Sequence, residues 1–238
     1  MGVLLLAQGD PEAKEMLKRA IAGRYGTTPP VIETMHAEFK GRARVKVGPI
    51  MTWIPMDMTT LFHFPAAMRF DFKVRPLKLP VQHGIESFDG ETYRSVRRGS
   101  DMVAIAEEEA SYSIRRRLWA FAALLLTPIG EIYVKLSQTG DSCFTALHTK
   151  LNDEVTLCLR EDGKLDYVQV SCLNPDTERE QVFKLVTSGE QAPVDGLMLP
   201  KKIKAFWDDD PFFEAEPKSA ETNLEIPRSI FRLEEELE

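Results

Sequence analysis

The chain has 238 residues, of which 43% are hydrophobic and 28% are charged, a length and composition that suffice for one domain with a sizeable core. The formal net charge of −7 argues against nucleic acid as a partner, because binding to a phosphate backbone needs a basic face. No apolar run reaches the roughly 20 residues of a membrane-spanning helix, so no membrane span is expected.

The N-terminal ten residues have a composition of their own. Val3–Ala7 is apolar and is followed by Gln8-Gly9-Asp10, which is typical of the end of a secretory signal with a small residue at the cleavage point. A complete signal needs a longer apolar core after a positive charge. Residues 1–10 are therefore interpreted as a signal-peptide remnant or a flexible arm. The first interpretation predicts an exported, periplasmic protein, and the second leaves a cytoplasmic location open.

Residues 11–26 are predicted to form a helix. Asp10 is a suitable N-cap, Pro11 occupies the first helical position, and Gly23 or Gly26 can end the helix. From here to the C-terminus, residues 11–238 are expected to form a single domain.

After residue 30 the hydrophobic period changes to two. Residues 39–47 and 68–75 alternate between apolar and charged side chains, and shorter alternating runs follow at 132–136 and 155–159. Such alternation predicts strands with one face in a core and one in water. We expect residues 37–105 and 131–226 to form one continuous antiparallel sheet. Its predicted inner face includes Ala43, Val45, Phe70, Phe72, Val134 and Leu157.

Short turns separate these runs. The turn signals are Asp89-Gly90, Gly140-Asp141, Asn152-Asp153, Asp162-Gly163, Ser188-Gly189 and Asp195-Gly196. Connections this short favour an antiparallel meander. The exception is Glu107 to Leu126, which has apolar residues at helical spacing and ends before Pro128. A helix this apolar must be covered, and a curved sheet that holds it in its concavity is the simplest arrangement.

No group of residues has the spacing of a known catalytic or metal site. The three cysteines, Cys143, Cys158 and Cys172, contain no Cys-x-x-Cys pair and are interpreted as structural thiols. A turn at Asp162-Gly163 would place Cys158 opposite Tyr167, which disfavours a Cys158–Cys172 bridge. Asp208-Asp-Asp210 lacks the spacing of a calcium loop and is interpreted as a solvated turn. We therefore expect no enzyme, no cofactor and no metal.

The triplet Arg115-Arg116-Arg117 is the one tight basic cluster of the chain. Its simplest interpretation is the solvated flank of the mid-chain helix, and contact with an anionic lipid or a partner is the alternative.

One segment is unusually rich in soft apolar residues. Between positions 51 and 64 lie Met51, Trp53, Met56, Met58, Phe62 and Phe64. Methionine suits adaptable binding surfaces, which favours an apolar cavity or groove. Ordinary core packing, or an interface with a partner protein, remains the alternative, since an aromatic stripe is more often plain core.

The order of these elements resembles the LolA/LolB-like superfamily of periplasmic lipoprotein carriers and lipoprotein-sorting proteins. The resemblance covers most of residues 11–232. It rests on Phe64-Pro65-Ala-Ala-Met-Arg69-Phe-Asp-Phe72, Phe88-Asp89-Gly90-Glu-Thr-Tyr93, Gly196-Leu-Met-Leu-Pro200 and Asn223-Leu-Glu-Ile-Pro227, in that order. It implies a mainly β, α+β fold, in which a strongly curved antiparallel sheet forms an unclosed half-barrel and the two helices cover its concave face. The segment 48–61 is longer and more apolar than that pattern.

The leading hypothesis is a non-enzymatic carrier or sensor of a lipid-like or acyl-chain ligand, possibly in connection with a lipoprotein or another envelope protein. The ligand would lie between the sheet and the mid-chain helix, with Trp119 at the rim of the cavity. The alternative is an envelope protein–protein interaction module without a ligand. The predicted cavity lining consists of Trp53, Met58, Phe62, Phe64, Phe70, Phe72, Ile114, Leu118, Trp119 and Phe121.

Overall fold

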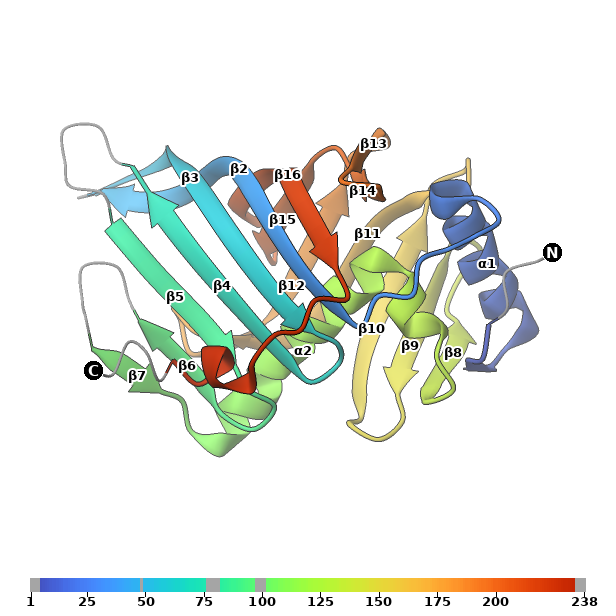
Figure 1. The fold of residues 1–238 in the computed structure, drawn as a ribbon, viewed down its shortest axis with the longest axis horizontal. Coiled ribbons are helices and arrows are strands. Elements are labelled where there is room, and N and C mark those ends of the chain that lie inside the picture. The colour runs from blue at the N-terminus through green and yellow to red at the C-terminus, as the bar shows by residue number, and fades with distance from the viewer. Residues whose placement is uncertain (1–4, 48, 76–81, 97–101, 234–238) are drawn as a thin grey trace.

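The computed structural model describes residues 5–47, 49–75, 82–96 and 102–233, which form one long sheet with two helices (Figure 1). The helices are α1 (Pro11–Tyr25) and α2 (Glu108–Leu125). The strands are β1 (Gln8–Gly9), β2 (Thr34–Val47), β3 (Ile50–His63), β4 (Ala67–Val74), β5 (Gln82–Phe88), β6 (Tyr93–Val96), β7 (Val103–Ile105), β8 (Val134–Gln138), β9 (Cys143–His148), β10 (Asp153–Leu159), β11 (Leu165–Asn174), β12 (Arg179–Thr187), β13 (Gln191–Val194), β14 (Leu197–Pro200), β15 (Ile203–Trp207) and β16 (Asp210–Thr222). Short 3-10 turns lie at Thr127–Gly130 and Arg228–Phe231.

Fourteen strands form the main sheet in the order β1-β8-β9-β10-β11-β12-β15-β16-β2-β3-β4-β5-β6-β7. Neighbours are antiparallel except β1 and β8, which are parallel. The sheet does not close on itself but curls around α2, while α1 lies against the β8–β9 end (Figure 1). This confirms the predicted fold class: a mainly β chain with an unclosed, curved antiparallel sheet and two helices.

Both helices begin and end close to the predicted positions. α1 follows the N-cap Asp10 and stops at Gly26, whose φ of 71° lies in the left-handed region that glycine tolerates. α2 begins after Glu107 and ends where Leu126 adopts a φ of 69°. The neighbouring Thr127-Pro128 cannot continue the helix.

Residues 5–10 do not form the expected flexible arm. The amides of Leu6 and Ala7 donate to the Gly130 carbonyl, and Gln8–Gly9 pairs with β8. Ala7 is only 3% exposed. Because this segment supplies the edge strand of the sheet, it is part of the fold. Residues 1–4 lie outside the described residues.

The alternating pattern sets the register as predicted. Ala43, Val45, Phe70, Val134 and Leu157 are buried, and Phe72 is half-buried. The hairpin turn at Asp162-Gly163 places Cys158 opposite Tyr167 as expected. Ser188-Gly189, in contrast, is not a hairpin turn. It is a bend between β12 and β13.

The interpretation of the cysteines as free thiols is wrong for two of them. Cys143 and Cys158 face each other on β9 and β10 and form a disulfide, with Cα atoms 4.2 Å apart. The β9–β10 turn lies at residues 149–152, earlier in the chain than its Asn152-Asp153 signal suggests, and this position brings the two cysteines opposite each other. Cys172 is a buried free thiol, and burial raises its pKa to about 12.

Within the part of the chain that the structure describes, no helix combines the length and the apolar character needed to cross a membrane.

Gly41 lies in the middle of β2, between Ala215 of β16 and Met56 of β3. A Cβ atom at this position would overlap the carbonyl oxygen of Glu214. Glycine within a strand often marks a close approach of backbones at a sharp bend. Here it allows β16 and β2 to approach where the sheet curves.

We therefore predict that Gly41→Ala lowers the free energy of unfolding by about 1–3 kcal/mol or more, as for overpacking of a core. Gly23→Ala is the matched control, because no atom lies within 4 Å of the added Cβ. A helix favours alanine, so the control should gain about 0.5–1 kcal/mol. Urea unfolding of both variants measures these changes, and equal effects would contradict the role of Gly41.

Candidate functional site

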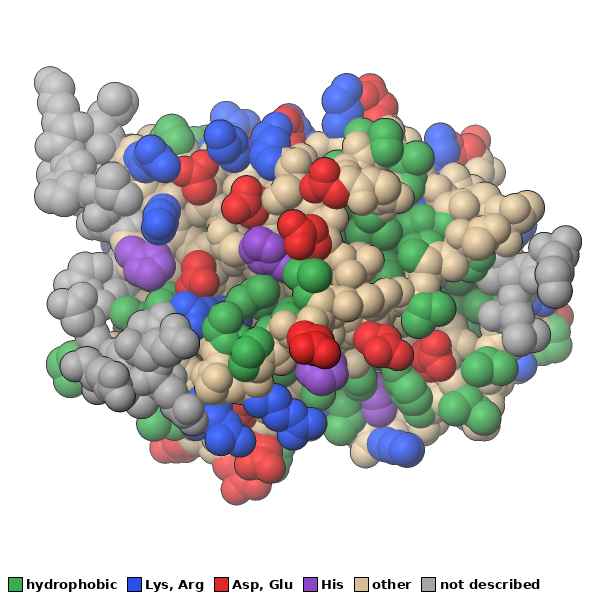
Figure 2. All heavy atoms as spheres, in the orientation of Figure 1, with side chains coloured by type: hydrophobic (Ala, Val, Ile, Leu, Met, Phe, Trp, Pro, Cys, Tyr) green, Lys and Arg blue, Asp and Glu red, His purple; other side chains and the backbone are tan. Residues whose placement is uncertain are grey.

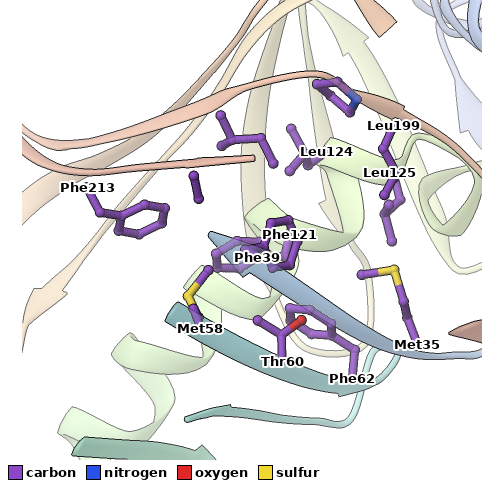
Figure 3. A pocket seen from close by; sticks show the side chains of 13 residues that line it. Met35, Phe39, Met58, Thr60, Phe62, Phe121, Leu124, Leu125, Leu199 and Phe213 are labelled. Atoms are coloured by element: carbon purple, nitrogen blue, oxygen red, sulfur yellow. The ribbon is translucent and has the colours of Figure 1, made fainter. Parts of the chain in front are cut away.

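A small cavity lies between the concave face of the sheet, the C-terminal end of α2 and the segment β14–β15 (Figure 3). Its volume is about 30 Å³. The wall is formed by Met35, Phe39, Met58, Thr60, Phe62, Phe121, Leu124, Leu125, Leu199, Pro200, Ile203, Phe213 and Ala215. Strands far apart in the sequence therefore meet α2 at this one place.

The wall is almost entirely apolar. Thr60 is the one lining residue with a polar side chain, and its hydroxyl donates to the Ala37 carbonyl at 3.2 Å. No charged group lines the cavity, so its chemistry suits a hydrocarbon and offers nothing for a reaction. Met35 and Met58 add flexible side chains that can adapt to the shape of a ligand.

The cavity is much smaller than a ligand pocket. A volume of about 30 Å³ holds one or two water molecules, whereas ligand pockets in proteins usually measure about 300–1,000 Å³. In this conformation the concavity of the sheet is filled by side chains. An acyl chain can enter only if part of the wall moves.

Three of the ten predicted lining residues touch the cavity directly, namely Met58, Phe62 and Phe121. Two more stand behind them. The Phe64 ring stacks on Phe62 with centroids 5.1 Å apart, and the Phe70 ring lies 5.0 Å from that of Phe121. These five side chains form an aromatic and thioether wall on one side of the cavity.

The other five predicted residues lie elsewhere. Ile114 and Leu118 are residues of α2 whose side chains are buried in the core, and Phe72 packs over Gly84. Trp53 points to the outer face of β3, where the Arg42 guanidinium lies 4.6 Å from its ring centroid. Strand alternation explains this placement, because an odd-numbered residue of β3 faces away from Met56, Met58 and Phe62.

Trp119 does not lie at the rim. It is 3% exposed, and its indole N–H donates to the Ala146 carbonyl at 2.8 Å. On an α-helix, residues 119 and 121 project about 200° apart. Trp119 therefore packs against β9 while Phe121 faces the cavity.

The hairpin of β13 and β14 covers the cavity and was not predicted as part of the site. Among the described residues these two strands pair only with each other, not with the main sheet. They continue the ladder of β12 and β15 after a bulge, where residues 188–190 oppose 201–202. Bulges bend and twist a ribbon, and this one turns the hairpin over the concave face. In the sequence, only the apolar residues Leu197 and Leu199 after the turn at Gly196 indicated that this hairpin has a buried face.

Few polar contacts hold this hairpin in place. Asp195 accepts a hydrogen bond from the Ala220 amide at 3.0 Å, and Lys201 pairs with Glu190 at 2.8 Å on the surface. Leu197 and Leu199 supply the apolar contacts, with exposures of 5% and 4%. Pro200 is buried as well, and Val194 packs against the core, so among the described residues the covering is attached mainly by apolar contacts.

The C-terminal end of α2 is fixed by α1. Arg24 and Tyr25 donate to the carbonyls of Leu124 and Leu125, the latter at 2.9 Å. Such bonds satisfy carbonyls that a helix end leaves free. Since Leu124 and Leu125 line the cavity, α1 positions this part of the wall.

The arginine triplet is not a solvated flank. Arg117 is 3% exposed, donates to Glu86 at 2.9 Å and to the Tyr93 hydroxyl at 3.1 Å, and lies 5.9 Å from the Trp207 ring. Burial opposes its charge, but the carboxylate of Glu86 raises the pKa of Arg117 overall. Burial, aided by Glu86, also raises the pKa of Tyr93. A charged pair thus connects α2 to β5 inside the concavity.

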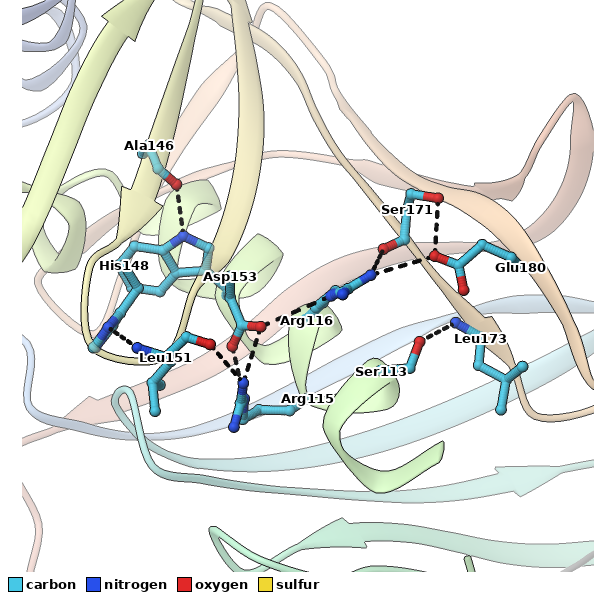
Figure 4. A network of polar contacts seen from close by, with 11 residues as sticks. Ser113, Arg115, Arg116, Ala146, His148, Leu151, Asp153, Ser171, Leu173 and Glu180 are labelled. Carbon is cyan, nitrogen blue, oxygen red and sulfur yellow. Dashed lines mark hydrogen bonds and ion pairs between the residues drawn. The ribbon is translucent and has the colours of Figure 1, made fainter. Parts of the chain in front are cut away.

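Arg115 and Arg116 bind the opposite half of the sheet (Figure 4). Arg115 donates to both oxygens of Asp153, at 2.6 and 3.0 Å, and Arg116 donates to Glu180 at 3.3 Å. Only Arg116 keeps a substantially exposed side chain. All three arginines therefore hold α2 in the sheet, and sequence spacing alone does not show this.

His148 lies beside Asp153, between the rings of Trp119 and Tyr133, at centroid distances of 5.2 and 4.6 Å. Its Nδ1 accepts a hydrogen bond from the Leu151 amide. Burial lowers the pKa of this imidazole. Burial therefore favours the neutral form of His148 in the folded protein.

Among the described residues, no three His, Cys, Asp or Glu side chains are grouped so that they could hold a metal ion. Asp208, the first residue of the acidic triplet, accepts hydrogen bonds from the Val182 amide and the Gln181 side chain. It thereby ties the turn between β15 and β16 to the neighbouring strand β12.

No protein-family model matches the sequence, and no curated protein sequence matches it significantly. Solved structures do match the backbone. A LolA superfamily protein from Nitrosomonas europaea is 10% identical, with 92% of this chain and 96% of that chain covered and a TM-score of 0.49. A DUF1329 family protein from Desulfovibrio piger is 9% identical, with 93% and 98% covered and a TM-score of 0.46. A domain from Vibrio parahaemolyticus, provisionally described as an outer membrane lipoprotein-sorting protein, is 8% identical, with 92% and 94% covered and a TM-score of 0.41.

The Arg117–Glu86 pair generates a stability prediction. Glu86→Gln leaves a buried cation without its counter-charge and should lower the free energy of unfolding by about 3 kcal/mol. Arg117→Met combined with Glu86→Gln removes both charges and should cost clearly less than the sum of the two single variants. Urea unfolding of the three variants tests this, and additive costs would show that the pair is not coupled.

His148 generates a pH prediction. The unfolded state takes up a proton near pH 6.5, whereas the folded state resists protonation. Its stabilising contribution is therefore complete above about pH 6.5 and is lost as the pH falls below that value. His148→Asn keeps an acceptor but does not titrate, so its unfolding free energy should depend less steeply on pH between about 7 and 5. Identical slopes in the two proteins would refute this.

Proposed function

We propose that this protein is a non-enzymatic carrier or sensor that binds an acyl chain or another lipid-like ligand between the concave face of the sheet and α2. The observation that carries this proposal is the apolar cavity under a hairpin that stands outside the main sheet. An apolar site under a cover that is held mainly by apolar contacts suits a ligand that must be shielded from water and later released.

Ligand entry requires the hairpin to move away from α2. The bulge at residues 188–190 is a natural hinge, because the bend there already interrupts the ladder. A swing of the hairpin would withdraw Leu199 and Pro200, and rotation of Phe121 would extend the cavity toward Phe70. In this way the wall formed by Met58, Phe62, Phe64, Phe70 and Phe121 would become available to the ligand.

The energetics permit such an opening. Each buried methylene contributes about 0.8 kcal/mol, so ten buried carbons supply roughly 8 kcal/mol before the cost of ordering the ligand. Opening exposes the side chains of Leu197 and Leu199, at about 1.5–3 kcal/mol for each leucine. A chain of this length therefore offsets the cost of moving the hairpin.

We further propose that the protein works in an exported, periplasmic location. The Cys143–Cys158 disulfide supports this, because structural disulfides form in oxidising compartments and are rare in the cytosol. The cytoplasmic location is the alternative.

A protein–protein interaction module without a ligand is the second candidate. The small volume of the cavity favours it, because a concavity filled by its own side chains is also what an ordinary core requires. Native mass spectrometry of the purified protein separates the two candidates. A carrier should retain a lipid-sized mass or take up an added fatty acid, whereas a docking module should do neither.

A matched pair of variants locates the binding site. Leu199→Trp adds volume at the buried mouth of the cavity, and Leu224→Trp makes the same change at a residue 38% exposed on the surface. Delipidated wild type and Leu224→Trp should gain thermal stability when a long-chain fatty acid is added, by mass action. Leu199→Trp should lose at least about tenfold in affinity.

The thermal shift should be measured below the micelle concentration of the fatty acid. Absence of any shift in the wild type would refute the carrier function. An equal shift in Leu199→Trp would refute this cavity as the site.

A further inference from the structure

The tip of the β2–β3 hairpin exposes apolar side chains to solvent. Ile50 is 66% exposed and Met51 is 49% exposed, and Trp53 follows half-exposed on the outer face of the sheet. In the register of the hairpin, Met51 lies opposite Lys46 and Trp53 lies opposite Arg44. We call the side chains of Arg44, Lys46, Ile50, Met51 and Trp53 the hairpin tip.

Cations surround these apolar residues. Arg44 and Lys46 have no ion-pair partner among the described residues. The nearby Arg42 pairs with Glu214 at 3.0 Å and lies over the Trp53 ring, and the one acidic residue of β3, Asp57, is paired with Arg75. Figure 2 shows Lys and Arg side chains along the upper edge of this face, with Asp and Glu side chains between and below them. In a chain of net charge −7, this local excess of unpaired positive charge stands out.

A group of exposed apolar side chains with a polar rim is typical of an interaction site. A bilayer that contains anionic phospholipids offers an apolar interior directly beneath a negatively charged surface. The hairpin tip presents the complementary arrangement, with Ile50 and Met51 at its end, Lys46 directly opposite Met51, and Arg44 two residue pairs farther back. Tryptophan favours the level of the headgroups between these two zones.

We propose that the hairpin tip docks this protein onto anionic membrane surfaces. Ile50 and Met51 enter the acyl region, Trp53 lies at the headgroups, and Arg44 and Lys46 pair with lipid phosphates. The other end of the same two strands, at Met35 and Phe62, lines the cavity. The docking proposal nevertheless stands independently of any ligand in that cavity.

Flotation of the full-length protein with lipid vesicles tests this. Wild type should float with vesicles that contain phosphatidylglycerol and not with pure phosphatidylcholine vesicles, and binding should fall as salt is raised to about 0.5 M. Each cation near an anionic surface contributes about a fivefold factor, so Arg44→Gln with Lys46→Gln should lose roughly 25-fold in affinity. Ile50→Ser with Met51→Ser should lose about tenfold or more.

Matched controls lie at the other end of the sheet. Ile132, at 61% exposure, and the exposed Lys135 of β8 allow the double variant Ile132→Ser with Lys135→Gln, which should float like the wild type. Circular dichroism of each variant checks that it is folded. The substituted side chains lie on the surface, so these changes should leave the fold intact.

Trp53 provides an independent readout. The other tryptophans, Trp119 and Trp207, are 3% and 6% exposed, so a change in emission on adding vesicles reports chiefly on Trp53. Brominated lipid should quench the wild type, and Trp53→Phe should abolish most of that quenching while still floating. Quenching that persists in Trp53→Phe would contradict the proposed orientation.

Several outcomes overturn the proposal. These are failure of the wild type to float with anionic vesicles at low salt, equal flotation with neutral vesicles, and flotation of the Ile50/Met51 variant at the wild-type level. Binding to soluble heparin that matches binding to vesicles would instead assign the cations to a polyanion, and it too would overturn membrane docking.

Discussion

The architecture depends on the need to bury α2 on nearly all sides. Leu118, Trp119, Ala120, Ala123 and Leu124 point in different directions around the helix, and each is at most 5% exposed. A flat sheet could cover only one of these faces, so the sheet must curl around the helix. The same constraint buries Arg117, which donates hydrogen bonds to Glu86 and Tyr93 on the concave face. The curvature, the internal ion pair and the narrow residual cavity all follow from one apolar helix.

The sequence was sufficient for the parts of the fold that depend on neighbouring residues. Alternation along β2 and β4 reports which side chains face the core, and Asp10, Pro11 and Gly26 mark the ends of α1 through their local backbone preferences. Because the turns are short, consecutive strands can pair only in an antiparallel arrangement. These features reflect rules that act over a few residues and need no knowledge of the remaining chain.

Local rules reach only part of the site. Strand alternation alone would have separated Trp53 from Met58, and helical periodicity would have separated Trp119 from Phe121. Leu199 could be assigned to the cavity only once a bulge was known to fold the hairpin over α2. The buried state of Arg117 likewise required its partner Glu86, 31 positions away. The Cys143–Cys158 pair needed the true position of one turn, because a shift of a few residues in the turn changes every cross-strand partner.

The two ends of the long sheet have a consequence for solubility. An open sheet offers unpaired backbone groups along each outer strand, and such an edge can recruit a second chain into a growing aggregate. Here the ladder of fourteen strands ends in β1, of two residues, and β7, of three. A template of two or three residues gives an incoming strand little to pair with. The tapering of the sheet therefore lets the barrel stay unclosed without becoming a seed for polymerisation.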